Sequence, residues 1–310
     1  MSPLRSMLRE YLAVRRALGF KLYSEGLLLE HFVDFAERLG ATYVTTDLAL
    51  KWASDPTDAP ARRGARRLGL VRHFARFASA SDSRTVVPPE NLIPYRYRRI
   101  APYIYRDEEV HRLLTAARQL PSSTGLRPHT YVTLLGLYAA AGLRPGEPLR
   151  LDREDVDLAH GVLTIRESKF GRSRLVPVHA STQHALQRYA DGRDRVFPCP
   201  RSASFFLCER GTRVSMESAS TTFSELVQQI GLSAGTGRRP PRIYDLRHRF
   251  AITTLTEWHR RGEDVGRRLP ELSTYLGHSS VANTYWYLTA TPELLRHALW
   301  RAERSQGVRA

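Results

Sequence analysis

Leu276–Thr289, with the sequence LGHSSVANTYWYLT, is the stretch that says most about the fold of this chain. A Gly-His pair ends an apolar helical run, and Tyr287 follows nine residues after His278. Tyr285 lies two residues before Tyr287, so the stretch carries two tyrosines shortly after a histidine.

The composition predicts two domains and a polyanionic partner. The chain has 310 residues, of which 42% are hydrophobic, enough for a real core. Lys and Arg number 47 against 31 Asp and Glu, a net charge of +16. A chain this basic favours nucleic acid as its partner, with an anionic membrane as the second candidate. No apolar run approaches the ~18–20 residues of a membrane span, and the arginine-interrupted N-terminus lacks the apolar core of a signal peptide, so we expect a cytoplasmic protein.

The cysteines give no sign of a disulfide framework or a metal site. Cys199 and Cys208 are the only cysteines, too few for a disulfide framework, and no histidine pair flanks them at a metal-ligand spacing. We therefore expect two reduced cysteines and no metal site.

The only lysines are Lys21, Lys51 and Lys169; the other basic residues are arginines. Because lysine can lose a proton near neutral pH and arginine effectively cannot, each lysine is a candidate for proton transfer.

Residues 1–82 are predicted to form a helical, DNA-binding domain. Apolar residues recur at helical spacing over 4–18 and 23–39, and further helices are predicted over 46–52 and 61–80. Gly19 and Gly40 are the expected stops. The last of these helices carries arginine pairs four residues apart, which a helix places on shared faces. The pairs near its start are Arg62, Arg63, Arg66 and Arg67.

Residues 83–102 are rich in proline and show no helical period, so we expect an extended basic linker between the domains. From Arg62 to Arg106 there are eleven arginines and two acidic residues, a net charge of +9. One interpretation is a solvated charged face. The other is a contact with the DNA backbone, for which the candidates in the linker are Arg96, Arg98 and Arg99.

Residues 103–304 are predicted to form a larger, mostly helical domain with a small antiparallel sheet. Asp107 is a plausible N-cap, a buried helix is expected over 128–141, and Gly142 stops it. Residues 162–166 and 173–178 alternate like a β-hairpin around the turn SKFGRS. Further helices are expected near 180–190, 216–230, 244–258, 267–276 and 292–303. The fold class is therefore mainly α, formally α+β.

Four clusters follow the linker in order: AGLRPGEPL, ESKFGRSRLVPV, YDLRHRFA and LGHSSVANTYWY. In this order and spacing they resemble the tyrosine recombinase (phage integrase) family, over most of the chain. The last cluster and its neighbours look most similar to integrases carried by transposable elements. The resemblance implies a core-binding domain, a linker and a catalytic domain, with no cofactor.

The resemblance assigns two arginines to a phosphate clamp. Arg144 would be the first, oriented by Glu147, and Arg247 in YDLRHRF would be the second. Two arginines can hold the extra negative charge of a phosphoryl transition state with bidentate, charge-assisted hydrogen bonds. On residue type alone, Arg144 is equally well an ordinary surface arginine.

The remaining catalytic positions are also implied by the resemblance. Lys169, in the hairpin turn, would be the general acid that protonates the leaving 5′ oxygen. His278 would contact the phosphate, and the family's histidine-to-tyrosine spacing selects Tyr287 over Tyr285 as the nucleophile. The alternatives without a catalytic role are that Lys169 is a solvated turn residue and that His278 only interacts favourably with a helix dipole.

Tyr244 departs from the family pattern, in which a histidine commonly stands at this position. A phenol has a pKa near ~10, so Tyr244 is a catalytic candidate that could donate a hydrogen bond to the scissile phosphate, but it is a poor base at neutral pH. His248 lies on the same helical face and would compensate only if its ring faced the site. A histidine packed within the helix bundle is the simpler interpretation.

Two functions of different classes follow. The first is a site-specific DNA recombinase that cuts and rejoins double-stranded DNA through a 3′-phosphotyrosine. It would assemble as a homo- or hetero-tetramer on two DNA sites. The amphipathic segment TPELLRHALWRAERS near the C-terminus would either bind to a neighbouring protomer or pack on its own domain. The second is a DNA-binding accessory protein of a mobile element that has lost catalysis, which Tyr244 favours. An RNA-binding module is a weaker third interpretation, because the sequence contains no RNP-type or KH-type motif.

Overall fold

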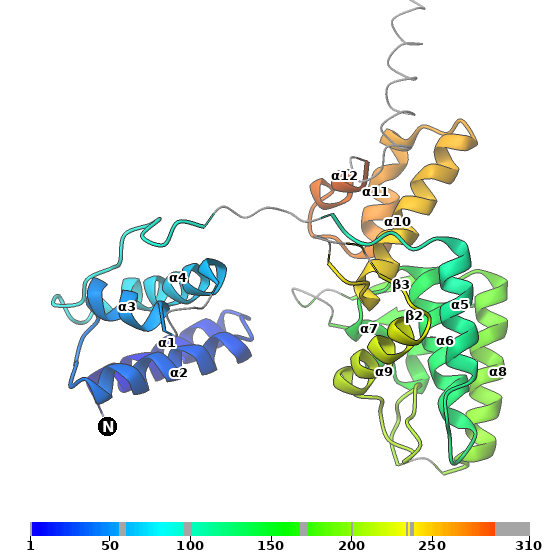
Figure 1. Ribbon diagram of the computed structural model, residues 1–310, viewed down its shortest axis with the longest axis horizontal. Coiled ribbons are helices and arrows are strands. Elements are labelled where there is room, and N and C mark those ends of the chain that lie inside the picture. The colour runs from blue at the N-terminus through cyan, green and yellow to red at the C-terminus, as the bar shows by residue number, and fades with distance from the viewer. Residues whose placement is uncertain are drawn as a thin grey trace, which may run out of the picture. The chain divides into compact units, whose positions relative to one another are not determined.

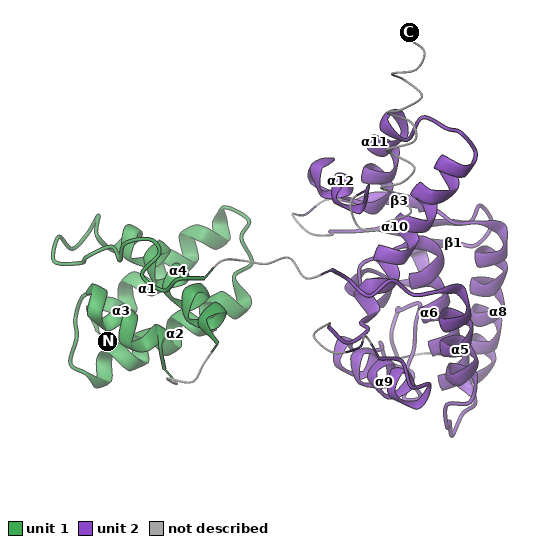
Figure 2. Ribbon diagram, turned by 45° about the horizontal axis from the view of Figure 1, so that its top comes forward, with its two compact units in different colours: residues 1–99 green, residues 100–310 purple. Residues whose placement is uncertain are grey.

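The computed structural model describes residues 2–55, 60–95, 101–167, 171, 173–199, 201–233, 235 and 239–288. It divides into two compact units, residues 1–99 and 100–310 (Figure 2). The described residues are mostly helical with a three-stranded antiparallel sheet, which confirms the predicted fold class. In this part of the chain no helix combines the length and the apolar character needed to cross a membrane.

The first unit contains α1 (Pro3–Ala17), α2 (Tyr23–Arg38), α3 (Thr46–Ala53) and α4 (Ala61–Ala78), each close to a predicted helix (Figure 1). Side-chain caps start two of them: the Ser2 hydroxyl accepts from the Arg5 N–H at 3.2 Å and the Thr45 hydroxyl accepts from the Leu48 N–H at 3.1 Å. The helical stripes meet in one apolar core that includes Phe32, Trp52 and Phe74.

The beginning of the expected linker folds onto this unit. The Val86 N–H donates to the Val44 carbonyl at 2.8 Å, and the Arg72 guanidinium donates to the carbonyls of Pro88 and Pro89 at 2.8 and 2.7 Å. Val87 and Ile93 pack against the core. The prolines exclude a helix here, as predicted, but residues 85–93 belong structurally to the first unit.

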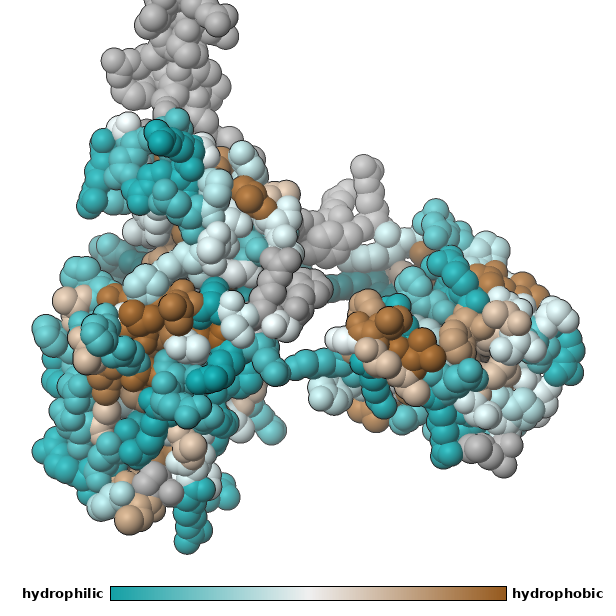
Figure 3. Space-filling view, turned by 180° about the vertical axis from the view of Figure 1, so that it is seen from behind, coloured by the Kyte–Doolittle hydropathy of each residue, from teal (hydrophilic) through white to brown (hydrophobic). Residues whose placement is uncertain are grey.

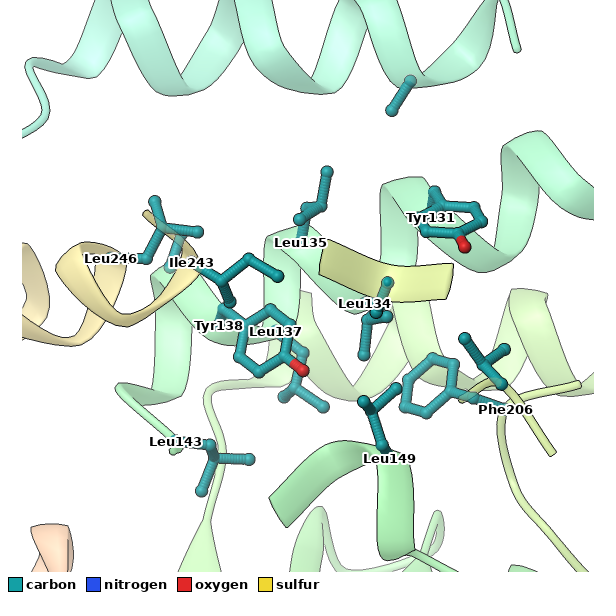
Figure 4. Close-up of a cluster of buried hydrophobic side chains, with 14 of the residues drawn as sticks. Tyr131, Leu134, Leu135, Leu137, Tyr138, Leu143, Leu149, Phe206, Ile243 and Leu246 are labelled. Carbon is teal, nitrogen blue, oxygen red and sulfur yellow. The ribbon is translucent and has the colours of Figure 1, made fainter. Parts of the chain in front are cut away.

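The second unit is built around α6 (Leu126–Ala141), with α5 (Asp107–Arg118), α7 (Gly146–Arg150), α8 (Ala180–Val196) and α9 (Met216–Gln229) in the same unit. The expectation that Asp107 caps α5 is wrong by one residue. Arg106 occupies the N-cap, and its N–H is satisfied at 2.8 Å by the carboxylate of Glu109. The core that holds the unit together is shown in Figure 4 and includes Leu134, Leu135, Leu137, Tyr138, Leu143, Leu149, Phe206, Ile243 and Leu246.

The sheet has the order β1-β2-β3, with β1 (Val156–Asp157) after a short 3₁₀ turn, η1 (Arg153–Asp155). The predicted hairpin is confirmed as β2 (Val162–Ile165) and β3 (Arg174–Pro177), paired antiparallel. Ile165 and Arg174 form the last pair before the turn that carries Lys169. Residues 168–170 and 172, and therefore Lys169, lie outside the described residues.

Three helices form a second apolar cluster at one end of this unit (Figure 1). They are α10 (Ile243–Arg260), α11 (Val265–Leu276) and α12 (Ala282–Leu288). α12 was not predicted from the sequence. Figure 3 shows a largely hydrophilic surface with apolar patches on the visible face of each unit, as the charged composition leads one to expect.

Candidate active site

Arg247, on α10, is a fully buried arginine at the centre of the candidate site. Its Nη1 donates to the Gly142 carbonyl at 2.8 Å and its Nη2 to the Leu276 carbonyl at 2.7 Å. These carbonyls lie at the C-terminal ends of α6 and α11, where the helix dipole is negative. Burial, and then the nearby charge of Arg144, lower the pKa of Arg247 from its ordinary value.

Arg144 and Arg174 share the buried carboxylate of Glu147. Arg144 donates from its backbone N–H and from Nη1, both at 2.8 Å. Arg174, on β3, donates from Nη1 and Nη2 at 3.0 and 2.9 Å. Burial alone would raise the pKa of Glu147, but the hydrogen bonds and charge of Arg174, together with those of Arg144, outweigh it and lower the pKa to about 2.

The end of α11 brings the three arginines together. The N–H groups of Gly277 and His278 return to carbonyls of the preceding turn, so the carbonyls of Ser273 and Thr274 are satisfied within the helix. The next three carbonyls each accept from a different arginine: Tyr275 from Arg174, Leu276 from Arg247 and Gly277 from Arg144. The orphan carbonyls of this helix end are therefore all paired with guanidinium groups.

Gly277 is required at this point for two reasons. Its φ of +68° lies in the left-handed region, which glycine adopts without strain. A Cβ atom here would lie 2.9 Å from Nη1 of Arg174, so a side chain would push that guanidinium away. The turn from α11 to His278 is consequently fixed by both backbone and packing.

His278 follows this turn and is held by α12. Its Nδ1 lies 2.7 Å from the hydroxyl oxygen of Thr284, which is fully buried. Burial, and then the positive charges of Arg247, Arg144 and Arg174, lower the pKa of His278 to about 4. The imidazole is therefore neutral at pH 7 and lies near the arginines without adding a like charge.

Tyr287, on α12, is 2% exposed, whereas Tyr285 is 53% exposed. The Tyr287 ring stacks on His278, with centroids 6.1 Å apart and an interplanar angle of 18°, and contacts the His248 ring at 5.5 Å. Tyr244 contacts the other side of this group, with its ring 5.0 Å from that of His248. His248 is buried, as the simpler interpretation expected, but it is buried against the candidate nucleophile.

Hydrogen bonds to the end of α11 thus bring Arg144, Arg174 and Arg247 together beside His278, and Glu147 joins this group through Arg144 and Arg174. Ring contacts link Tyr244, His248 and Tyr287. Two residues of the cluster were not singled out in the sequence, Arg174 and Thr284. Arg174 is one of 44 arginines and carries no local signal of burial. Thr284 lies six residues after His278, a spacing from which its contact with the imidazole could have been suspected.

The predicted DNA-contacting arginines of α4 have different surroundings. Arg62 and Arg63 are exposed. Arg66 forms an ion pair with Glu25 at 3.0 Å. Arg67 lies over the ring of Trp52, 3.9 Å from its centroid, and donates to the Asp55 carbonyl. Arg96, Arg98 and Arg99 lie outside the described residues.

The lowered pKa of His278 gives a titration prediction. Its folded pKa of about 4 lies below the ordinary value of 6.5, so the unfolded chain binds this proton more tightly. The contribution of His278 to stability is therefore complete above pH 6.5 and is lost as the pH falls toward 4. In NMR titrations of the ring protons we expect no midpoint for His278 between pH 5.5 and 8; a midpoint near its ordinary value would contradict the buried, cation-facing ring.

Comparison with known proteins identifies the family of this chain. The profile of the phage integrase family matches residues 104–293. A protein of Sinorhizobium fredii (strain NBRC 101917 / NGR234), y4rB, an integrase/recombinase by name, is 44% identical over 308 residues, which cover 98% of each chain. The tyrosine recombinase XerD of Mycobacterium tuberculosis is 33% identical over 88% of this chain and 85% of its own.

Among solved structures, the Tn1549 transposon integrase in complex with transposon right end DNA superimposes with a TM-score of 0.68. It covers 98% of this chain and 99% of its own at 16% identity, so it supports the fold. The profile match and the two relatives support the family. The chain belongs to the phage integrase family and is by that membership a tyrosine-type site-specific recombinase.

Proposed function

We propose that this protein cuts and rejoins double-stranded DNA through a covalent 3′-phosphotyrosyl intermediate. The observation that carries the proposal is the convergence of Arg144, Arg247, His278 and Tyr287 at the end of α11. Glu147 neutralises only one of the three guanidinium charges of Arg144, Arg174 and Arg247, so the group keeps an excess of positive charge beside a neutral imidazole and a tyrosine, which is suited to an anion.

The chemistry assigns one role to each group. The Tyr287 phenol gives up its proton to solvent and its oxygen attacks the phosphorus, the bond to the 5′ oxygen breaks, and the DNA 3′ phosphate remains on the tyrosine. Arg144 and Arg247 stabilise the charge on the non-bridging oxygens, and His278 donates a hydrogen bond to one of them. Lys169 protonates the departing 5′ oxygen. The bond energy is kept in the phosphotyrosine, so rejoining consumes no cofactor.

One detail of Arg247 supports an oxyanion ligand. Its Nε is buried and finds no hydrogen-bond acceptor among the described residues, while Nη1 and Nη2 are both engaged. Buried N–H groups are nearly always paired, so an unpaired one calls for an explanation. A phosphate oxygen that reaches this position on DNA binding would satisfy it.

Tyr244 is the feature that favours the second candidate function, a DNA-binding accessory protein without catalysis. Its position nevertheless leaves an imidazole beside the proposed nucleophile, because His248 contacts the rings of both Tyr244 and Tyr287. The proposed recombinase therefore does not depend on a histidine at position 244.

The test is a nicked suicide duplex built from the DNA ends that adjoin the coding region. The nick lets a short product diffuse away, so a covalent protein–DNA adduct accumulates and is visible on a denaturing gel. We expect an adduct with the wild-type protein. Specific binding to this duplex without an adduct would favour the accessory protein.

The same proposal includes a DNA-bound assembly. We propose that the first unit and the catalytic unit bind opposite sides of the duplex, that the basic segment between them crosses it, and that four protomers join two sites. The segment 291–305, which would be exchanged between neighbours, lies outside the described residues.

Replacing Arg96, Arg98 and Arg99 with alanine tests the contact of the linker with DNA. Each lost phosphate contact should lower the slope of log K against log[salt] by about 0.9, so we expect a visibly flatter salt dependence. A matched control removes Arg118, Arg188 and Arg195, which are exposed on α5 and α8, and keeps the net charge equal. Equal slopes for the two triple variants would exclude the linker contact.

A further inference from the structure

We propose that Arg174 is a positioning residue for strand cleavage: it holds Glu147 and the C-terminal end of α11 in place, so that Arg144 and His278 are aimed at the same phosphate. This inference rests on the proposed function, since it assigns a role within that reaction.

Every nitrogen of the Arg174 guanidinium is bound to protein. Nη1 and Nη2 donate to the two carboxylate oxygens of Glu147, at 3.0 and 2.9 Å, and Nε donates to the Tyr275 carbonyl at 2.8 Å. The side chain is 10% exposed. A bidentate pair of this kind fixes direction as well as distance. Arg174 therefore faces the protein scaffold, in contrast to Arg247, whose Nε is left unbound.

The hydrogen bonds of Arg174 lead to the clamp through Glu147. The same carboxylate accepts from the backbone and from Nη1 of Arg144. One buried carboxylate thus orients two guanidinium groups. Removing either arginine changes the charge balance around Glu147 and therefore around the other arginine. The direction of Arg144 depends on a carboxylate whose own position is fixed by Arg174.

A second route leads to His278. Arg174 binds the first of the three carbonyls at the end of α11, and its Nη1 occupies the space beside Gly277. His278 is the next residue, and Nδ1 of its ring is held by Thr284. The backbone on one side and α12 on the other therefore determine where the imidazole points.

A third consequence concerns the β2–β3 turn. Arg174 and Ile165 form its last strand pair, so the ion pair with Glu147 anchors the base of the turn to α7. Lys169 lies in the same turn, five residues before Arg174 in sequence. Arg174 thereby connects the chain segment of the proposed general acid to the arginine clamp.

The experiment compares Arg174→Gln with Arg174→Lys, and uses Arg166→Gln as the matched control. Arg166 lies at the other side of the same turn, is 58% exposed and pairs with Asp155 and Glu154. On the nicked duplex at saturating protein, we expect Arg174→Gln to slow adduct formation by about 10- to 100-fold, as the loss of partners behind functional ligands does. DNA affinity should change less than about threefold, because no Arg174 nitrogen is directed at DNA.

Rescue and coupling distinguish positioning from a general loss of structure. Arg174→Lys keeps the charge without the bidentate geometry and should recover part of the rate. Combining Arg174→Gln with Glu147→Gln should slow cleavage little more than the worse single variant, because both act through one carboxylate. Wild-type cleavage by Arg174→Gln, a loss confined to DNA affinity, or multiplicative effects in the double variant would each overturn the inference.

A measurement without DNA separates this inference from the proposed function. The groups that face His278 are Arg144, Arg174, Arg247, Thr284 and Tyr287. Removing the Arg174 charge should raise the pKa of His278 in the NMR titration, whereas Arg166→Gln should leave it unchanged. If no wild-type adduct forms but this shift is seen, the proposed reaction is wrong and the placement of Arg174 is right. An unchanged pKa overturns the inference.

Discussion

Replacing Tyr287 with phenylalanine is expected to abolish the covalent protein–DNA adduct, and replacing Tyr285 in the same way is expected to leave it. The substitution removes one oxygen and keeps the aromatic ring. Since Tyr287 is 2% exposed and packs against His248, His278 and Trp286, the phenylalanine ring should keep the same contacts. The fold should survive while the proposed nucleophile is lost, so adduct formation should fall to background.

Tyr285 is the matched control because it lies on the same short helix, two residues away, and is 53% exposed. The measurement is the yield of adduct on the nicked duplex, with DNA affinity determined separately by gel shift. Both variants should bind DNA like the wild type. An adduct with Tyr287→Phe, combined with its loss in Tyr285→Phe, would show that the nucleophile is Tyr285.

Glu147→Gln is expected to cause the largest loss of stability. The substitution keeps the shape of the side chain but removes the charge that two poorly exposed guanidinium groups share. Arg144 and Arg174 are only 18% and 10% exposed in their side chains, so water compensates them little. Removing one partner of a buried ion pair typically costs about 3–5 kcal/mol. We expect a loss of this order in the free energy of unfolding.

Urea unfolding followed by tryptophan fluorescence measures the effect, and Glu154→Gln is the matched control. Glu154 is 76% exposed and pairs with Arg166 at 3.3 Å, so its removal should change stability by less than about 1 kcal/mol. Similar losses of unfolding free energy in the two variants would mean that the Glu147 charge does not stabilise Arg144 and Arg174.

The effect of Glu147 should depend on pH in a defined direction. Its folded pKa of about 2 lies below the ordinary value of 4.5, so its stabilisation is complete above pH 4.5 and is lost as the pH falls toward 2. The difference between wild type and Glu147→Gln should therefore be constant from pH 8 to about 5 and shrink below pH 4.5. A difference that grows on acidification would contradict the assigned ion pair.

The sequence predicted the elements whose pattern is local. The helices of the first unit follow from their apolar periods, and the β-hairpin follows from alternation on both sides of SKFGRS. α12 was missed because Thr284 and Tyr287 become buried only through packing against α10 and α11. The prolines of the linker excluded a helix but gave no information on the packing of residues 85–93 onto the first unit.

The candidate site was predicted as a set of residue types, and its internal connections were not. The family resemblance of the four clusters implied that Arg144, Arg247, His278 and Tyr287 belong to one group. Arg174 was missed because its burial depends on Glu147 and Tyr275, which are 27 and 101 residues away in the chain. For His248 the sequence offered packing or proximity to the site as alternatives, and the structure combines them.

The last turn of α11 has a consequence for how the site comes apart. Three guanidinium groups from α10, β3 and the loop after α6 have acceptors on three consecutive carbonyls, so one local unfolding event at this helix end would remove an acceptor from all three at once. Each arginine keeps a second acceptor, which is Glu147 for Arg144 and Arg174 and the Gly142 carbonyl for Arg247. Fraying of this helix end should therefore loosen the three arginines together without detaching any of them from the second unit.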